Sequence, residues 1–147
     1  MTVEAPDLAA AREAQRLFFE IGMVQRARVA HALGELGLTF AQAHALRLLD
    51  PDRALAMSAL ASLLVCDASN VTGIADRLEA RGLVERKTIG DDRRVKTLVL
   101  TTAGVELRKR VYQLMSEPPE AILALSPQDQ RTLRDILHRA VDHLHPR

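Results

Sequence analysis

The stretch that decides the fold is Asp67–Thr101, which reads DASNVTGIADRLEARGLVERKTIGDDRRVKTLVLT. Its first part has three apolar residues at helical spacing, which are Val71, Ile74 and Leu78. Asp67 suits the N-cap of such a helix, because its carboxylate can accept hydrogen bonds from the free amides of the first turn. Gly82 suits the left-handed position at which helices often end. The pattern predicts a helix over 67–81.

A β-hairpin is expected directly after this helix. Two short β-prone runs, Leu83–Val84 and Leu98–Leu100, flank a charged insert that carries Gly90 as a turn residue. A hairpin of this kind behind a helix forms a wing, here over 88–96. Lys87 stands at the shoulder of the insert.

The polar face of the predicted helix suits the major groove of DNA. It carries Ser69, Asn70, Thr72, Gly73, Asp76 and Arg77. Small residues allow close approach, amide and hydroxyl groups reach base edges, and an arginine reaches phosphate. A solvated surface helix has the same composition, so the face alone leaves both interpretations open.

The tip of the hairpin has a composition suited to the minor groove. Arg94 on a thin hairpin can enter a narrow groove, where the negative potential is concentrated. Asp92 can hold this arginine extended, and Arg93 and Lys96 lie near the phosphate backbone in this interpretation. The alternative is a solvated loop of mixed charge, which Asp91 and Asp92 favour.

Three motifs in this order resemble the MarR family of bacterial winged-helix regulators. They are Asp76-Arg77-Leu78-Glu79-x-x-Gly82-Leu83-Val84-x-Arg86, then Asp92-Arg93-Arg94, then Leu100-Thr101-x-x-Gly104. The resemblance covers nearly the whole chain. It implies a mainly α fold with a small β-hairpin wing, in which a winged helix-turn-helix core is flanked by long N- and C-terminal dimerisation helices.

The resemblance also implies a function. MarR-like proteins are dimers whose terminal helices interlock, and a two-fold dimer presents two recognition helices to a near-palindromic operator. The implied function is a ligand-responsive repressor that binds double-stranded DNA as a homodimer. The resemblance suggests a small anionic or phenolic effector, although no residue here selects one.

The flanking sequence predicts helices on both sides of the core. A long helix is expected from Asp7 to about Leu36, and Thr39-x-x-Gln42 forms a capping box for the next helix. Further helix starts are predicted at Ser58, Thr101 and Ser126. The predicted core covers 38–101, and the predicted dimerisation region covers 1–37 and 102–147 in one compact chain. The terminal helices carry more apolar surface than a small domain covers from one side, which also favours a partner chain.

Bulk properties limit the function classes. The 147 residues carry a net charge of +1, so nucleic-acid binding must come from local charge rather than a polycationic chain. No apolar run approaches the roughly 20 residues of a membrane span, and no secretion signal is seen, so a cytoplasmic protein is expected. No nucleophile-base set or metal-ligand cluster has usable spacing, so no enzyme, metal or cofactor is expected.

Two open points concern sensing and the partner class. Cys66 lies beside a helix N-terminus that can lower a thiol pKa, but a free cysteine is more often a small apolar residue. His138, His143 and His145 lack the spacing of a metal pair. The alternative function is a winged-helix module that binds protein without reading DNA, which the near-neutral net charge favours.

Overall fold

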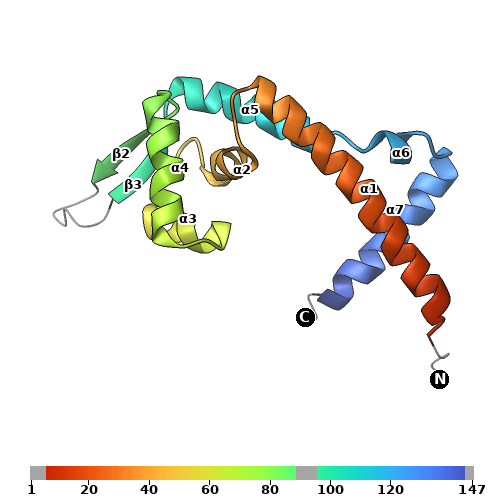
Figure 1. The fold of residues 1–147 in the computed structure, drawn as a ribbon. Helices are drawn as coiled ribbons and strands as arrows, with labels where there is room; N and C mark the ends of the chain where they lie inside the picture. Colours follow the sequence, from red (N-terminus) through yellow and green to blue (C-terminus); the bar gives the residue numbers. More distant parts are fainter. Residues whose placement is uncertain (1–5, 89–95, 145–147) are drawn as a thin grey trace. The chain divides into compact units, whose positions relative to one another are not determined.

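The computed structural model describes residues 6–88 and 96–144, and they fall into two compact units. One unit contains residues 1–26 and 117–147, and the other contains residues 27–116. The elements, labelled in Figure 1 where there is room, are α1 (Leu8–Glu35), α2 (Phe40–Leu48), β1 (Leu55–Ala56), α3 (Met57–Leu64), α4 (Ala68–Ala80), β2 (Val84–Thr88), β3 (Lys96–Leu100), α5 (Thr102–Ser116), α6 (Glu120–Leu123) and α7 (Pro127–Leu144). The predicted fold class, mainly helical with a small wing sheet, is confirmed. The predicted core, 38–101, lies within the second unit, and its boundaries stay a prediction.

Most of the predicted helix ends are confirmed by their capping bonds. Thr39 and Gln42 form the complete capping box of α2. The side chain of Asp67 accepts from the backbone N–H of Asn70 at the start of α4. Thr101 Oγ1 accepts from the N–H of Gly104 at 3.0 Å, and Ser126 Oγ does the same for Asp129 at 3.1 Å.

The predicted start of α3 at Ser58 is wrong. The helix begins at Met57, its N-cap is Ala56, and no side chain caps it. The physical reason is that Ala56 still belongs to β1, which pairs with β3, so the chain passes from strand to helix without a free capping position.

The wing sheet has three antiparallel strands in the order β1-β3-β2. Strands β2 and β3 pair in the hairpin register that joins Val84 to Leu100 and Thr88 to Lys96. The insert 89–95, which contains Gly90 and the predicted tip, lies outside the described residues. Strand β1 was not expected, because a two-residue strand has no detectable alternation.

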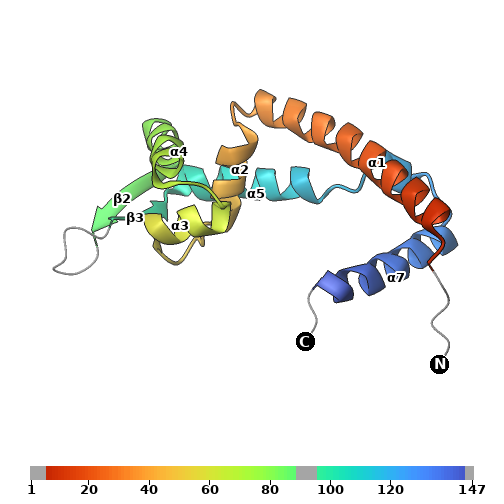
Figure 2. The same cartoon turned by 60° about the horizontal axis from the view of Figure 1, so that its bottom comes forward.

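The core of the second unit forms where α2, α3, α4 and the wing strands meet (Figure 2). Val71, Ala75 and Leu78 of α4 are buried, which confirms the predicted apolar stripe except that Ile74 is half-buried. They join Leu46 and Leu60, which are fully buried. Burying one face of α4 in this way leaves its opposite face to solvent.

A tight junction locks the start of α5 against the end of α4. Thr101 Oγ1 donates to the carbonyl of Gly82 at 2.6 Å, and its N–H donates to the carbonyl of Leu83 at 3.1 Å. Gly82 has a φ of +69°, a conformation that favours glycine. A Cβ on Gly104 would lie 1.9 Å from the carbonyl oxygen of Leu83, so only glycine fits there.

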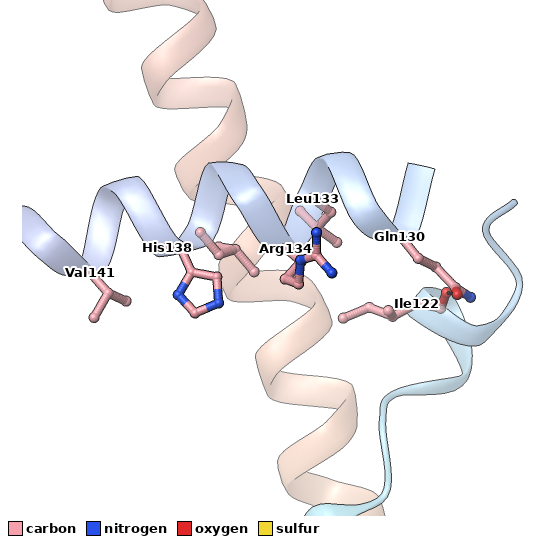
Figure 3. A pocket seen from close by; sticks show the side chains of 7 residues that line it. Ile122, Gln130, Leu133, Arg134, His138 and Val141 are labelled. Carbon is pink, nitrogen blue, oxygen red and sulfur yellow. Dashed lines mark hydrogen bonds between the residues drawn. The ribbon is translucent and has the colours of Figure 1, made fainter. Parts of the chain in front are cut away.

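The first unit leaves much of its apolar surface uncovered. Helix α7 has no buried residue along its 18 residues. The large exposed apolar side chains of this unit are Leu8, Leu17, Phe18, Phe19, Ile21, Met23, Val24, Leu123, Leu125, Ile136, Leu137, Val141 and Leu144. Leu133, Leu137 and Val141 of α7 line a hollow of about 390 Å³, toward which Ile122 of α6 points (Figure 3). An exposed apolar hollow of this kind favours an interaction site.

Among the described residues, no single helix is long and apolar enough to cross a membrane. Helices α3 and α4 pass that test only together, by length and composition, although they are bent by 109°. Leu60 of α3 and Val71 and Leu78 of α4 are buried in the core of the second unit.

Candidate DNA-binding surface

The solvent face of α4 presents the polar residues that the sequence singled out. Ser69, Asn70, Thr72, Gly73 and Arg77 are all exposed. The structure therefore brings these five together on one helix, with the small residues in the first turns and the arginine one turn later. No atom lies within 4 Å of the position of a Cβ on Gly73, so the backbone is open to close approach there.

The N-terminus of α4 is fixed by local hydrogen bonds. Asp67 Oδ1 accepts from the Asn70 N–H at 2.9 Å and from Ser69 Oγ at 2.8 Å. The hydrogen bond from the Asn70 N–H, and to a smaller extent that from Ser69, lowers the pKa of the Asp67 carboxyl below its usual value. Asp67 is therefore ionised at neutral pH. Thr72 Oγ1 donates to the carbonyl of Ala68 at 2.8 Å. With their protons used locally, the hydroxyl oxygens of Ser69 and Thr72 remain as acceptors for a base amino group.

Asn70 and Arg77 keep their side chains available for a ligand. Neither side chain makes a hydrogen bond or ion pair to any residue that the structure describes. Both line a hollow of about 230 Å³, together with Thr39, Gln42, Gly73 and Ile74. The N-terminus of α2 therefore borders the exposed face of α4, which sequence reasoning did not anticipate. A helix N-terminus beside an arginine favours an anion.

Arg86 joins strand β2 to α4 by pairing with two acids of that helix. From strand β2, its Nη2 pairs with Asp76 Oδ1 at 2.5 Å and its Nη1 with Glu79 Oε2 at 3.1 Å. Nη2 also donates to the carbonyl of Thr72 at 3.4 Å. The side chain is only 25% exposed, so this pairing is less screened than a surface ion pair. The single positive charge of Arg86 offsets part of the negative charge of the two carboxylates, and Arg77 forms no ion pair with a described residue.

A second arginine fixes the other end of α4. Arg81, the C-cap residue, donates from Nη1 to the carbonyl of Gly37 at 2.7 Å and from Nη2 to that of Leu36 at 3.0 Å. These carbonyls follow the C-terminus of α1, where a cation is favourable. Sequence reasoning missed the roles of Arg81 and Arg86, although Arg86 stands in one of the quoted motifs.

The wing is described only up to its shoulders. Lys96 is exposed at the start of β3, opposite Thr88, and Lys87 is exposed opposite Thr97. The predicted tip residues Asp92, Arg93 and Arg94 lie outside the described residues, so their roles stay a prediction. Strand β2, which precedes the tip in the sequence, pairs with β3 and contacts α4.

The other candidate groups that the structure describes form no cluster of metal ligands. Within residues 6–88 and 96–144 no three His, Cys, Asp or Glu side chains are grouped to hold a metal ion. Cys66 is half-buried and free. The exposed face of α4 offers hydroxyl acceptors, an amide and a cation, and these groups suit the recognition of a nucleic acid.

Comparison with known proteins agrees with this geometry. Residues 38–96 match the model of the MarR family. The chain is 30% identical over 116 residues to the organic hydroperoxide resistance transcriptional regulator of Bacillus subtilis, and the match covers 77% of this chain and 76% of that protein. Among solved structures, MepR, a transcription regulator of the Staphylococcus aureus multidrug efflux pump MepA, superposes with a TM-score of 0.77 at 22% identity, over 89% of this chain and 98% of that one. A point mutant of MepR bound to an oligodeoxyribonucleotide gives a TM-score of 0.68 at 23% identity, over 90% and 98% of the two chains.

Proposed function

This chain belongs to the MarR family and is a DNA-binding transcriptional regulator, and from that membership we propose that it acts as a dimer that represses from a near-palindromic operator. The observation that carries the proposal is the exposed polar face of α4. The apolar stripe of α4 is buried in the core, and its other side exposes Ser69, Asn70, Thr72, Gly73 and Arg77.

In the proposed mode, α4 enters the major groove with its N-terminal turns facing the bases. Asn70 can pair with an adenine through both groups of its amide, and Ser69 and Thr72 can accept from base amino groups. Arg77 anchors phosphate beside the N-terminus of α2. An oligodeoxyribonucleotide complex of a structural neighbour, MepR, supports duplex DNA as the partner.

The wing supplies the second contact in this proposal. Arg94 enters the minor groove with Asp92 steadying it, while Arg93 and Lys96 lie near the phosphate backbone. Lys96 is exposed at the base of the tip, as this role requires. The pairing of Arg86 with Asp76 and Glu79 joins the wing to α4, so the two contacts would move as one body.

Dimerisation is supported by the uncovered apolar surface of the terminal helices. Leu137 and Val141 of α7, and Phe18 and Ile21 of α1, are exposed in the single chain. A second copy is the occupant expected for such self-complementary helices, and a two-fold pair sets two α4 helices one helical turn of DNA apart. The homodimer, the effector response and a cytoplasmic, non-enzymatic role complete the proposal.

Salt dependence of DNA binding tests this function. The duplex is first selected from a random pool, and affinity is then measured against salt. Each neutralised phosphate contributes a log–log slope of about −0.9, so a regulator gives a steep dependence. A flat dependence without a retained duplex would favour a module that binds protein.

Replacing Asn70 by alanine tests base reading. The Asn70→Ala variant should lose preference for the selected duplex while its binding to random DNA stays nearly unchanged, because the amide contacts bases and not phosphate. Equal weakening of both duplexes would remove Asn70 from the reading surface.

Replacing Arg94 by alanine tests the wing. We expect at least a tenfold loss of affinity, on the order of 1.4 kcal/mol. Unchanged affinity of Arg94→Ala would exclude the minor-groove contact while leaving α4 as the reading element.

A further inference from the structure

Gln42 of α2 is a buried polar residue beside the DNA-binding surface. It is only 6% exposed, and with Asn70 and Arg77 of α4 it lines the hollow of about 230 Å³. In the capping box of α2, Oε1 of Gln42 accepts from the backbone N–H of Thr39 at 3.0 Å. Because that N–H can only donate, the amide oxygen of Gln42 must face it, and the amide nitrogen lies on the other side.

This amide nitrogen has no acceptor among the described residues. Apart from the bond to Thr39, the side chain of Gln42 makes no hydrogen bond to any residue that the structure describes. Nε2 carries two protons, and buried donors are normally paired because an unpaired one costs free energy. A nearly buried donor in the lining of a hollow therefore indicates an acceptor inside that hollow.

The other groups around the hollow also favour an anion. Arg77 supplies a positive charge, and Thr39 Oγ1 accepts from the N–H of Gln42 at 3.2 Å, so its own proton can be donated. The described residues that line the hollow include no carboxylate. The hollow also lies at the N-terminus of α2, a helix of nine residues, where the free amides and the helix dipole favour negative charge.

We propose that Gln42 and Arg77 together hold one phosphate of the DNA backbone between α2 and α4. Arg77 supplies the charge, and Nε2 of Gln42 supplies a neutral donor whose direction is fixed, because Thr39 holds the amide oxygen. A capping role alone accounts for the oxygen of Gln42 and leaves its nitrogen unexplained. The inference rests on the proposed function, to which it adds a DNA contact from outside the recognition helix.

This contact would fix the position of α4 along the duplex. Asn70 lines the same hollow, so the phosphate held there lies beside the base that Asn70 reads. Phosphate contacts set the orientation of a protein on DNA but carry no sequence information. Loss of the Gln42 contact should therefore weaken binding to the selected duplex and to random DNA by the same factor, in contrast to the loss of Asn70.

The variant Gln42→Glu separates the cap from the contact. Glutamate keeps an oxygen for the N–H of Thr39 and is a usual capping-box residue, so the Tm should not fall below that of the parent. The second oxygen of the new carboxylate replaces the donor and repels a phosphate. Affinity for the selected duplex should fall at least tenfold, about 1.4 kcal/mol. Parental affinity in Gln42→Glu overturns the proposal.

Uncharged phosphates locate the contact on the duplex. Each backbone phosphate of the selected duplex is replaced in turn by methylphosphonate, and affinity is measured for the full-length protein and its variants. At one position in each half-site the replacement should weaken the parent. It should affect Arg77→Gln and Gln42→Glu much less, because the first lacks the charge and the second offsets it. If the two variants lose sensitivity at different positions, Gln42 and Arg77 do not share a phosphate and the proposal is wrong.

Two variants control for net charge and for the new carboxylate. Gln113→Glu adds the same charge at an exposed position of α5 and should bind every duplex as the parent does. Equal losses in Gln42→Glu and Gln113→Glu would attribute the effect to net charge and overturn the proposal. Gln42→Met removes the donor without adding a charge, and it should lose sensitivity at the same phosphate as Gln42→Glu. Parental sensitivity of Gln42→Met at every position would also overturn the proposal.

Further outcomes separate this contact from the proposed function and from a free anion. A parent that binds its selected duplex no more tightly than Gln42→Glu does keeps the proposed function and loses this contact. A parent that binds no duplex overturns both. Inorganic phosphate at constant ionic strength should not displace the duplex from the parent. Displacement that disappears in Arg77→Gln would assign the hollow to a free anion and overturn the proposal.

Discussion

Gly104 allows the close contact between the start of α5 and the chain that follows α4. A methyl group there would lie 1.9 Å from the carbonyl oxygen of Leu83, which is backbone and cannot turn away. Gly104→Ala should therefore cost about 3 kcal/mol, near the upper end of overpacking effects. That corresponds to a Tm lower by roughly 6–12 °C. A Tm within about a degree of the parent would show that the backbone at Leu83 can move away from residue 104 without loss of stability.

Gly73 provides the matched contrast, because its Cβ position is open and it lies inside a helix. Gly73→Ala should stabilise the protein by roughly 0.5–1 kcal/mol. The same methyl would stand between α4 and the groove, so DNA affinity should fall while the Tm rises. If DNA affinity and Tm both rise in Gly73→Ala, Gly73 does not lie against the DNA.

Arg86 connects two elements, the wing strand β2 and the helix α4. It holds Asp76 and Glu79 of α4 from strand β2. Arg86→Gln would release both carboxylates toward the phosphates and loosen the wing from the helix. We expect at least a tenfold loss in operator affinity, on the order of 1.4 kcal/mol, and a shallower dependence of affinity on salt, because salt also screens the new repulsion.

Lys109→Gln is the control for Arg86, because Lys109 makes an exposed ion pair with Glu106 on α5, where such pairs contribute little. The control should leave DNA binding unchanged. If both variants lose affinity equally, the loss reflects net charge and not the link between wing and helix.

The sequence predicted those elements whose signals are local. The Asp67 cap, the Thr39–Gln42 capping box and the Gly82 stop each depend on residues within one turn, and each is confirmed. Strand β1 was missed because two residues form it only by pairing with β3. The same holds for the site: the face of α4 follows from helical spacing, whereas the contacts of Arg81 with Leu36 and Gly37 join residues that lie far apart in the chain.

For the whole molecule, the proposed dimer depends on the terminal helices. Leu137 and Val141 are exposed on α7, on the face that lines the hollow beside Ile122. The double substitution Leu137→Asp with Val141→Asp should yield monomers, because an unpaired charge in an apolar interface is strongly unfavourable. Sedimentation measures the change. Arg139→Asp places the same charge on another face of the helix and should leave the dimer intact.

The measurement that tests the central claim most directly is a hydroxyl-radical footprint of the full-length protein on its selected duplex. Two copies that each insert α4 should protect two patches related by a two-fold axis, with centres about one helical turn, or roughly 34–36 Å, apart. A single protected patch, or none at protein concentrations that saturate the duplex, would contradict the account.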